Sequence, residues 1–111
     1  MTPLEAAEKY IDIFYSGKPL DGLVQLLDPA CTFEGPFFKF NSAEAYINSL
    51  RESPPVGMEI EVIDRYSNEY SACIVYRFNK GDISSPMSQR FVVKNGRVIS
   101  IQLIFDSACF A

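Results

Sequence analysis

The sequence of 111 residues contains no histidine and no tryptophan. Without histidine there is no Ser-His or Cys-His nucleophile pair and no histidine-based metal site, so a proton transfer near neutral pH has to use a carboxylate, a tyrosine, a lysine or a cysteine. The sequence also has no GxGxxG motif, no P-loop and no cluster of metal ligands. We therefore expect no cofactor and no metal.

Positive charge is scarce as well, since 10 Lys and Arg residues face 14 Asp and Glu residues and give a net charge of −4. Nucleic acid and anionic membranes are bound by clustered Lys and Arg, so neither is expected as a partner. No apolar run approaches the roughly 18 residues of a membrane span, and the N-terminus is not a basic leader. These features predict a cytoplasmic protein.

Cysteine is rare too. Cys31, Cys73 and Cys109 form an odd set without CxxC spacing, so we expect free thiols. What the chain does have is 48% hydrophobic residues, including nine Phe and six Tyr. A chain of this length has material for one core, which predicts a single domain over residues 1–111.

Three helices are predicted in the first half of the chain. Thr2, Pro3 and Glu5 form a capping box with proline in the first turn, and this helix ends at Gly17. A second, shorter helix begins at Pro19 and is stopped by the Asp-Pro pair at 28–29. The third follows the Asn-Ser-Ala-Glu sequence at 41–44 and ends before the Ser-Pro-Pro sequence at 53–55.

Strands follow where the hydrophobic period changes to two. Residues 31–35 have the aromatic and β-branched content of a first strand, and residues 58–62 and 70–78 alternate apolar with polar side chains. Which face of the 70–78 strand points inward stays open. The order predicts an α+β protein: a cone-shaped fold with three N-terminal helices packed on a curved antiparallel sheet.

A last hairpin spans residues 89–105 about Lys94-Asn95-Gly96. A two-residue loop would pair Phe91 with Ser100 and mix polar and apolar side chains on both faces. We therefore predict a three-residue loop with Gly96 in a bulge. This register gathers one apolar face and leaves Gln89 as its polar member, near an edge or pointing into a pocket. The apolar residues of that face are Phe91, Val93, Ile99, Ile101, Leu103 and Phe105.

Three segments together resemble the nuclear transport factor 2-like superfamily, especially its SnoaL-like members. These segments are residues 9–17, residues 23–37 and the hairpin with its following Asp106, so nearly the whole chain is covered. The resemblance implies a cone-shaped α+β fold with a deep apolar pocket, often dimeric through the outer sheet face. Known activities include isomerases, cyclases, epoxide hydrolases and binding proteins, so the fold alone does not assign a function.

The ketosteroid isomerases are the enzymes whose pattern can be placed on this chain. By that resemblance Tyr10 corresponds to the oxyanion-hole tyrosine, and the catalytic aspartate falls on Gly35, so the usual base is missing. The second oxyanion-hole acid falls on Gln89, or on Ser88 in the other register. Gln89 is able to donate a hydrogen bond to a carbonyl as a neutral amide.

Each of these residues also has an ordinary interpretation. Tyr10 is either a core tyrosine or a hydrogen-bond donor in a pocket. Glu34 is either a solvated strand carboxylate or, if the strand bulges at Gly35, a buried general base. The aromatic residues serve equally well as core and as the lining of a flat hydrophobic site.

The candidate site residues follow from both arguments. The catalytic candidates are Tyr10 and Glu34, and the ligand-binding candidates are Tyr10, Phe14, Phe33, Phe37, Phe38, Tyr46, Gln89, Phe91, Ile101, Leu103 and Phe105. We expect a protein that binds a small apolar, carbonyl-bearing molecule. The alternatives are an isomerase or cyclase with an unusual base, and a structural or protein-interaction module.

A homodimer is also expected, through the outer face of the sheet. Val92, Val98 and Ile104 are predicted to place apolar groups on that face, among Arg90 and Ser100. A mixed apolar and polar surface of this kind is typical of a moderate-sized interface.

Overall fold

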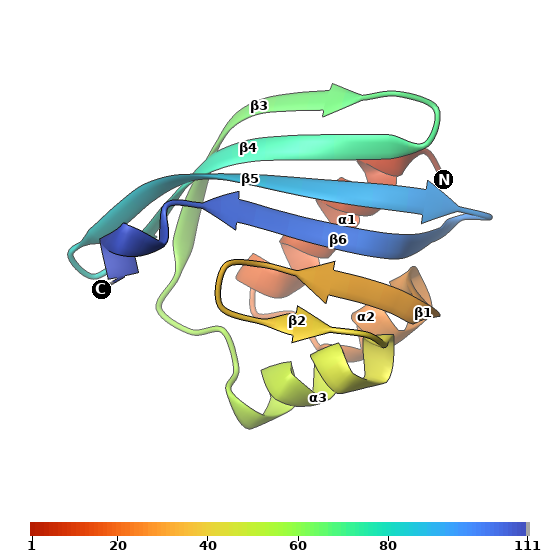
Figure 1. Ribbon diagram of the computed structural model, residues 1–111, viewed down its shortest axis with the longest axis horizontal. Helices are drawn as coiled ribbons and strands as arrows, with labels where there is room; N and C mark the ends of the chain where they lie inside the picture. The colour runs from red at the N-terminus through yellow and green to blue at the C-terminus, as the bar shows by residue number, and fades with distance from the viewer. Residues whose placement is uncertain (111) are drawn as a thin grey trace.

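A computed structural model describes residues 1–110 as an α+β fold (Figure 1). The elements in chain order are α1 (Pro3–Tyr15), α2 (Asp21–Leu26), β1 (Leu27–Glu34), β2 (Lys39–Phe40), α3 (Ala43–Glu52), β3 (Glu59–Ser67), β4 (Ser71–Lys80), β5 (Ile83–Lys94), β6 (Arg97–Phe105) and the 3-10 helix η1 (Ser107–Phe110). The predicted α+β class is confirmed, with three α-helices and one mostly antiparallel sheet.

The helices begin where the capping residues predict. The Thr2 hydroxyl accepts a hydrogen bond of 3.1 Å from the Glu5 backbone N–H, and the Glu5 carboxylate accepts one of 3.0 Å from the Thr2 N–H. Ser42 caps α3 in the same way, with its hydroxyl 3.1 Å from the Ala45 nitrogen. Both starts are therefore set by local sequence.

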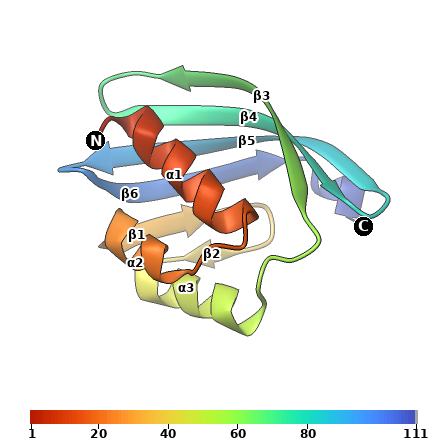
Figure 2. The same cartoon turned by 180° about the vertical axis from the view of Figure 1, so that it is seen from behind.

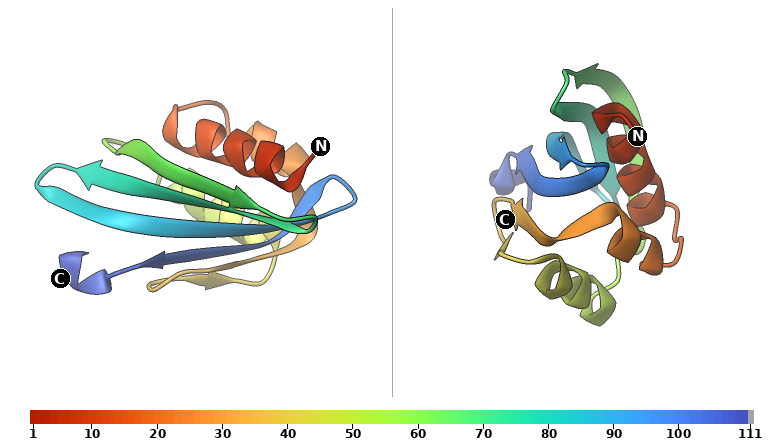
Figure 3. Two further views of the ribbon diagram at one scale, coloured as in Figure 1. Left: turned by 90° about the horizontal axis from the view of Figure 1, so that it is seen from above. Right: turned by 90° about the vertical axis from the view of Figure 1, so that its right-hand side faces the viewer.

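The six strands form one sheet in the order β2-β1-β6-β5-β4-β3. All neighbours are antiparallel except β1 and β6, which run parallel, so the prediction of a fully antiparallel sheet was wrong at this one pairing. The reason is topological: β1 pairs with the last strand of the chain, whose direction is already determined by the β3–β6 meander. Figure 3 shows the curvature of the sheet, and Figure 2 shows α1 lying across one of its faces.

The second helix is shorter than predicted. It ends at Leu26, and the Asp-Pro pair at 28–29 lies inside β1 instead of terminating a helix. The pairing of β1 with β6 is irregular between Leu27 and Thr32. Pro29, which has no N–H to donate, is tolerated in that irregular stretch.

The β5–β6 hairpin corrects the predicted loop. Lys94 pairs with Arg97, so the turn has two residues, Asn95 and Gly96, with φ of 53° and 76° as a type I′ turn requires. A bulge at Ile99 of β6, opposite the step from Val92 to Val93, then restores the expected pairing, because Phe91 lies opposite Ile101. The apolar face was predicted correctly beyond this bulge.

The bulge also changes which residue of β6 is buried next to the turn. Val98 is fully buried and Ile99 is partly exposed, the reverse of the predicted arrangement. Val98 therefore does not belong to the outer sheet face. Ile104 remains there with 61% of its surface exposed, and Val92 is half-buried.

The core lies between the helices and the inner face of the sheet. Helix α1 packs against β3, β4 and β5, while α3 packs against β1 and β2. On β4 the inward side chains are Ala72, Ile74, Tyr76 and Phe78, which settles the face left open by the sequence. No helix within residues 1–110 is long and apolar enough to cross a membrane.

Candidate functional site: an aromatic pocket

A cavity of about 470 Å³ opens between the C-terminal halves of α1 and α3 and the inner face of the sheet. Seven of the predicted ligand-binding residues line it: Phe14, Phe33, Phe37, Phe38, Tyr46, Leu103 and Phe105. The structure therefore brings together side chains from α1, the β1–β2 hairpin, α3 and β6. We refer to this cavity as the aromatic pocket.

The rings of the pocket pack against one another and leave part of their surface uncovered. Phe33 stacks on Tyr46 with ring centroids 4.6 Å apart, and Phe37 meets Phe105 edge-on at 5.6 Å. At the mouth, Phe37 is 53% exposed and Phe38 is 64% exposed. Apolar rings exposed to this extent at the entrance of a cavity are typical of a ligand site.

Four of the predicted residues do not line the pocket. Tyr10, Gln89, Phe91 and Ile101 are all buried in the core behind its wall. Tyr10 packs on Phe91, with ring centroids 5.1 Å apart. Tyr10 and Gln89 therefore do not themselves face the cavity.

Buried hydroxyl groups connect these core residues to the pocket. The Tyr10 hydroxyl is hydrogen-bonded to the Tyr46 hydroxyl, and Tyr46 lines the cavity. On the other side of the core, the Tyr76 hydroxyl donates to Gln89 Oε1 at 3.0 Å and lies 3.0 Å from the Tyr15 hydroxyl. Since each phenol has one proton and that of Tyr76 is used on Gln89, Tyr15 is the donor to Tyr76.

The pair at the pocket floor has no such constraint from a third partner. Either hydroxyl of Tyr10 and Tyr46 is able to donate to the other. When Tyr10 is the donor, the Tyr46 proton is available to an acceptor in the pocket.

All four phenols stay neutral at physiological pH. Burial, reinforced by the neighbouring Tyr46, raises the pKa of Tyr10 well above its ordinary value. Burial likewise raises the pKa of Tyr46 and of Tyr76, and it raises the pKa of Tyr15 to about 12. These side chains are suited to donating hydrogen bonds and not to acting as bases.

No carboxylate occupies the position of the expected base. Gly35 lines the pocket, and a Cβ atom added to it would lie 3.3 Å from the Phe33 ring, which partly fills the space a side chain there would need. Glu34 points to the other face of the sheet, 59% exposed and 4.0 Å from the Lys39 ammonium nitrogen. Among the described residues, Glu52 at the rim is the one carboxylate that lines the pocket.

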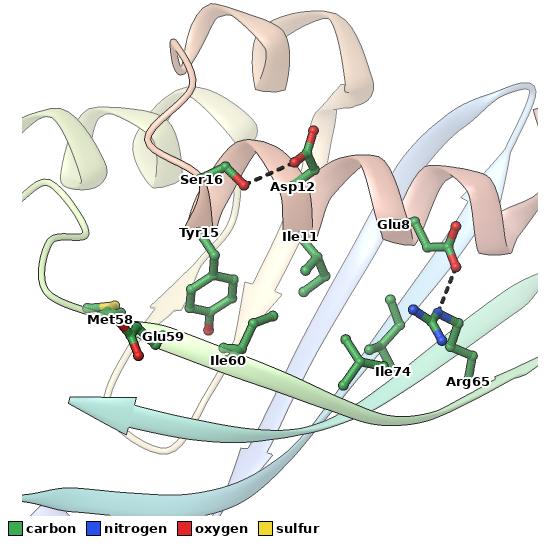
Figure 4. Close-up of a pocket in the computed structure, with 11 residues that line it drawn as sticks. Glu8, Ile11, Asp12, Tyr15, Ser16, Met58, Glu59, Ile60, Arg65 and Ile74 are labelled. Atoms are coloured by element: carbon green, nitrogen blue, oxygen red, sulfur yellow. Dashed lines mark hydrogen bonds and ion pairs between the residues drawn. The ribbon is translucent and has the colours of Figure 1, made fainter.

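A second cavity of about 600 Å³ lies between α1 and β3 (Figure 4). Its floor is apolar, with Ile11, Ile60 and Ile74, but several of its polar groups are already paired within the protein. The Glu8 carboxylate is 2.8 Å from Arg65, and the Ser16 hydroxyl donates to Asp12 at 3.0 Å. Because those polar groups have partners and the rings of the aromatic pocket are uncovered, the aromatic pocket is the better candidate.

Sequence reasoning missed several residues of the aromatic pocket. They are Tyr15, Phe40, Leu50, Met58, Phe78, Met87 and Phe110, with the polar Ser49, Glu52 and Ser53 at the rim. Phe78 and Met87 share the inward face of β4 and β5 with Gln89, and that face was left unassigned. Phe110 lies on η1, and its ring packs on that of Phe105 with centroids 5.0 Å apart. No local sequence pattern predicts this contact.

Among residues 1–110, no three His, Cys, Asp or Glu side chains gather as metal ligands. The cysteines are separate from one another: Cys31 is buried, Cys73 half-buried and Cys109 exposed. Burial, with the nearby Asp28 charge, raises the pKa of the Cys31 thiol to about 12, so it is not a nucleophile at neutral pH.

No protein-family profile matches the sequence, and no curated protein matches it either. Solved structures do resemble it in fold. A nuclear transport factor 2-like protein of unknown function from Cytophaga hutchinsonii has a TM-score of 0.84 at 17% identity, covering 99% of this chain and 95% of that chain. A Kribbella flavida protein assigned provisionally as a ketosteroid isomerase has a TM-score of 0.82 at 17% identity, covering 94% and 77%.

A third similar structure is a Jannaschia protein assigned provisionally as a SnoaL-like polyketide cyclase. Its TM-score is 0.75 at 15% identity, and the match covers 99% of this chain and 92% of that chain. These similarities confirm that the chain has the nuclear transport factor 2-like fold. At such identities the likeness concerns the fold.

Proposed function

We propose that this protein binds a small apolar molecule in the aromatic pocket and holds a carbonyl oxygen of that molecule with the Tyr46 hydroxyl. The observation that carries this proposal is the buried pair of Tyr10 and Tyr46 hydroxyls, of which Tyr46 lines the cavity. A cavity of about 470 Å³ is in the range used for small-molecule ligands.

Tyr10 acts through Tyr46 in this arrangement. In the proposed complex Tyr10 donates to the Tyr46 oxygen, and the Tyr46 proton is then directed to the ligand in the pocket. A donor that is preoriented in a water-poor site gains more from a ligand acceptor than a mobile one.

Binding is favoured over catalysis because polarising a carbonyl is not enough for isomerisation. Proton abstraction requires a base beside the ligand, and the family position for it is Gly35. The isomerase or cyclase alternative would have to use Glu52 at the rim, since Glu34 faces away. A proton-exchange assay on a bound ketone separates the two functions, because only a base at the site accelerates exchange of the protons next to the carbonyl.

The binding test uses two probes of the same shape, 2-acetylnaphthalene and its carbonyl-free analogue 2-isopropenylnaphthalene. One net hydrogen bond of roughly 0.5–1.5 kcal/mol predicts that the ketone binds about two- to tenfold more tightly than the alkene in titration calorimetry or fluorescence. Tyr46→Phe should remove that difference while leaving alkene affinity unchanged. Tyr70→Phe, at an exposed tyrosine, is the matched control.

Two results would contradict the proposal. Absence of saturable binding for both probes would contradict the ligand site. Equal affinity for ketone and alkene in the unchanged protein would contradict the contact between the ligand carbonyl and the Tyr46 hydroxyl. If neither probe binds, the remaining alternative, a structural or protein-interaction module, is favoured.

We propose further that two copies associate through the outer face of the sheet. Ile104 and the half-buried Val92 give this face apolar area, and Arg90 donates to Gln102 at 3.2 Å beside them. A surface of this mixed composition supports a moderate interface, which would leave the aromatic pocket on the opposite face of each sheet free.

A further inference from the structure

The charges around the aromatic pocket indicate which charge a ligand group at the pocket mouth should carry. This inference rests on the proposed function and adds the charge of the ligand to it. The inner part of the pocket is apolar with one phenol donor, as described above. The rim is formed by the last turns of two helices, and its one carboxylate is that of Glu52.

Both helices direct their C-terminal ends to this rim. Phe14 and Tyr15 come from the last turn of α1, and Ser49 and Glu52 come from the last turn of α3. Figure 2 shows α1 and α3 running toward the same side of the molecule. The free carbonyl groups at a helix C-terminus give it a partial negative charge, so two such ends make the rim electronegative.

Glu52 strengthens that negative potential. It is the last residue of α3, where the helix dipole disfavours a carboxylate and favours a cation. Within residues 1–110, Glu52 forms no ion pair with a Lys or Arg side chain. Arg51, the neighbouring base, reaches away to Asp21 of α2 at 3.2 Å, and Lys18 beside the end of α1 is paired with Asp12.

The residues of the pocket wall also favour a cation over an anion. Among the described residues, no Lys or Arg side chain lines the cavity, whereas phenylalanine rings surround its mouth. Aromatic faces carry negative charge density and attract ammonium groups placed over them. The ring faces, the two helix ends and the Glu52 carboxylate therefore all favour a positively charged group at the pocket mouth.

We propose that the aromatic pocket takes a ligand that is an apolar cation, with its apolar body inside and an ammonium group at the mouth, between Glu52 and the exposed faces of Phe37 and Phe38. Anionic ligands such as carboxylates are excluded by the same potential. A site for free fatty acids or other organic acids would need a cationic side chain at the rim to bind the carboxylate, and the pocket therefore differs from such a site.

The test uses three probes with one body: 4-phenylbutylamine, 4-phenylbutan-1-ol and 4-phenylbutyrate. The cation–π attraction and the attraction of a cation to the helix C-termini together predict that the amine binds about five- to tenfold more tightly than the alcohol at low salt. The carboxylate should bind more weakly than the alcohol. Titration of the unchanged protein by calorimetry or NMR gives the three affinities.

Two variants assign the preference to the rim. Glu52→Gln should reduce amine affinity about threefold at low salt and leave alcohol affinity unchanged. Glu44→Gln, at an exposed acid in the first turn of the same helix, is the matched control and should change neither. Raising the salt concentration should weaken the amine relative to the alcohol.

Each outcome decides between the two proposals. If the alcohol or carboxylate binds as tightly as the amine, or if Glu52→Gln behaves like Glu44→Gln, the charge class is overturned while apolar binding stands. If 2-acetylnaphthalene binds and none of the phenylbutyl probes does, the charge class is overturned as well. If neither series binds, the proposed function itself fails.

Discussion

The Tyr76 hydroxyl donates a 3.0 Å hydrogen bond to Gln89 Oε1, and both side chains are buried on the inner face of the sheet. Tyr76 comes from β4 and Gln89 from β5, two neighbouring antiparallel strands. This contact fixes the orientation of the Gln89 amide oxygen. The one long polar side chain on the inner face of β5 therefore has a partner on the neighbouring strand.

Gln89→Leu should destabilise the fold. Leucine has a similar volume but leaves the Tyr76 hydroxyl buried without its acceptor, which costs roughly 1–3 kcal/mol of unfolding free energy. Urea denaturation measures the loss. Gln102→Leu, the same change on the outer face, should alter stability by less than about 0.5 kcal/mol. A double variant Gln89→Leu with Tyr76→Phe should recover part of the loss, and full additivity of the two changes would contradict the buried contact.

Stability should fall in alkaline solution. The pKa of Tyr15 is raised from 10.0 to about 12, chiefly by burial, so the folded protein retains this proton after the unfolded chain has lost it. The contribution is fully present below pH 10 and is lost as pH rises from 10 to 12, by about 2–3 kcal/mol for this one group.

Denaturation midpoints measured at intervals from pH 9 to 12 test this expectation, with phenolate absorbance recorded in parallel. Tyr15→Phe should make the decline less steep but not abolish it, because Tyr15 is one of four buried phenols with a raised pKa. Tyr70→Phe, at an exposed position, is the control and should leave the slope unchanged. A decline that is identical in Tyr15→Phe and the unchanged protein would exclude Tyr15 as its source.

Ile104→Arg should weaken the proposed dimer. The side chain is 61% exposed in the single chain, so the change has little effect on folding but places a charge in the centre of the outer face. Sedimentation at micromolar concentration should give about twice the chain mass for the unchanged protein and the single mass for the variant. Val24→Arg, at an exposed apolar residue of α2, is the control and should stay dimeric. A monomer in the unchanged protein, even when concentrated, would contradict the interface.

Glu34→Gln should have almost no effect. The carboxylate is on the outside of β1, 4.0 Å from Lys39, and a surface ion pair of this kind contributes about 0–1 kcal/mol. Affinity for 2-acetylnaphthalene should be unchanged, since Glu34 does not reach the pocket. A large loss of ketone binding or of proton exchange would show that this segment turns inward and would restore Glu34 as a catalytic candidate.

The hairpin shows how far sequence reasoning reaches. Its Asn95-Gly96 dipeptide favours a two-residue turn, while the alternation of apolar residues requires Phe91 and Ile101 on one face. These two local signals conflict by one residue, and an extra residue in the loop or a bulge in the strand resolves the conflict equally well. Tertiary packing chose the bulge, which buries Val98 in the core.

The pocket shows the same limit at longer range. Its aromatic lining was predictable, because Phe33, Leu103 and Phe105 lie on inward faces of strands. The role of Tyr10 was not, since its partner Tyr46 is 36 residues away in the chain. Sequence patterns gave no reason to place Tyr10 behind Tyr46 instead of inside the cavity.

The sequence by itself determined the order of the main helices and strands, the starts of α1 and α3, and the apolar face of the β5–β6 hairpin beyond its bulge, because capping and hydrophobic period act over a few neighbouring residues. Only the tertiary structure decided the parallel pairing of β1 with β6, the outward position of Glu34 and the empty volume between α1, α3 and the sheet. A cavity is the space that side chains from distant segments leave unfilled, and its shape depends on all of those segments together.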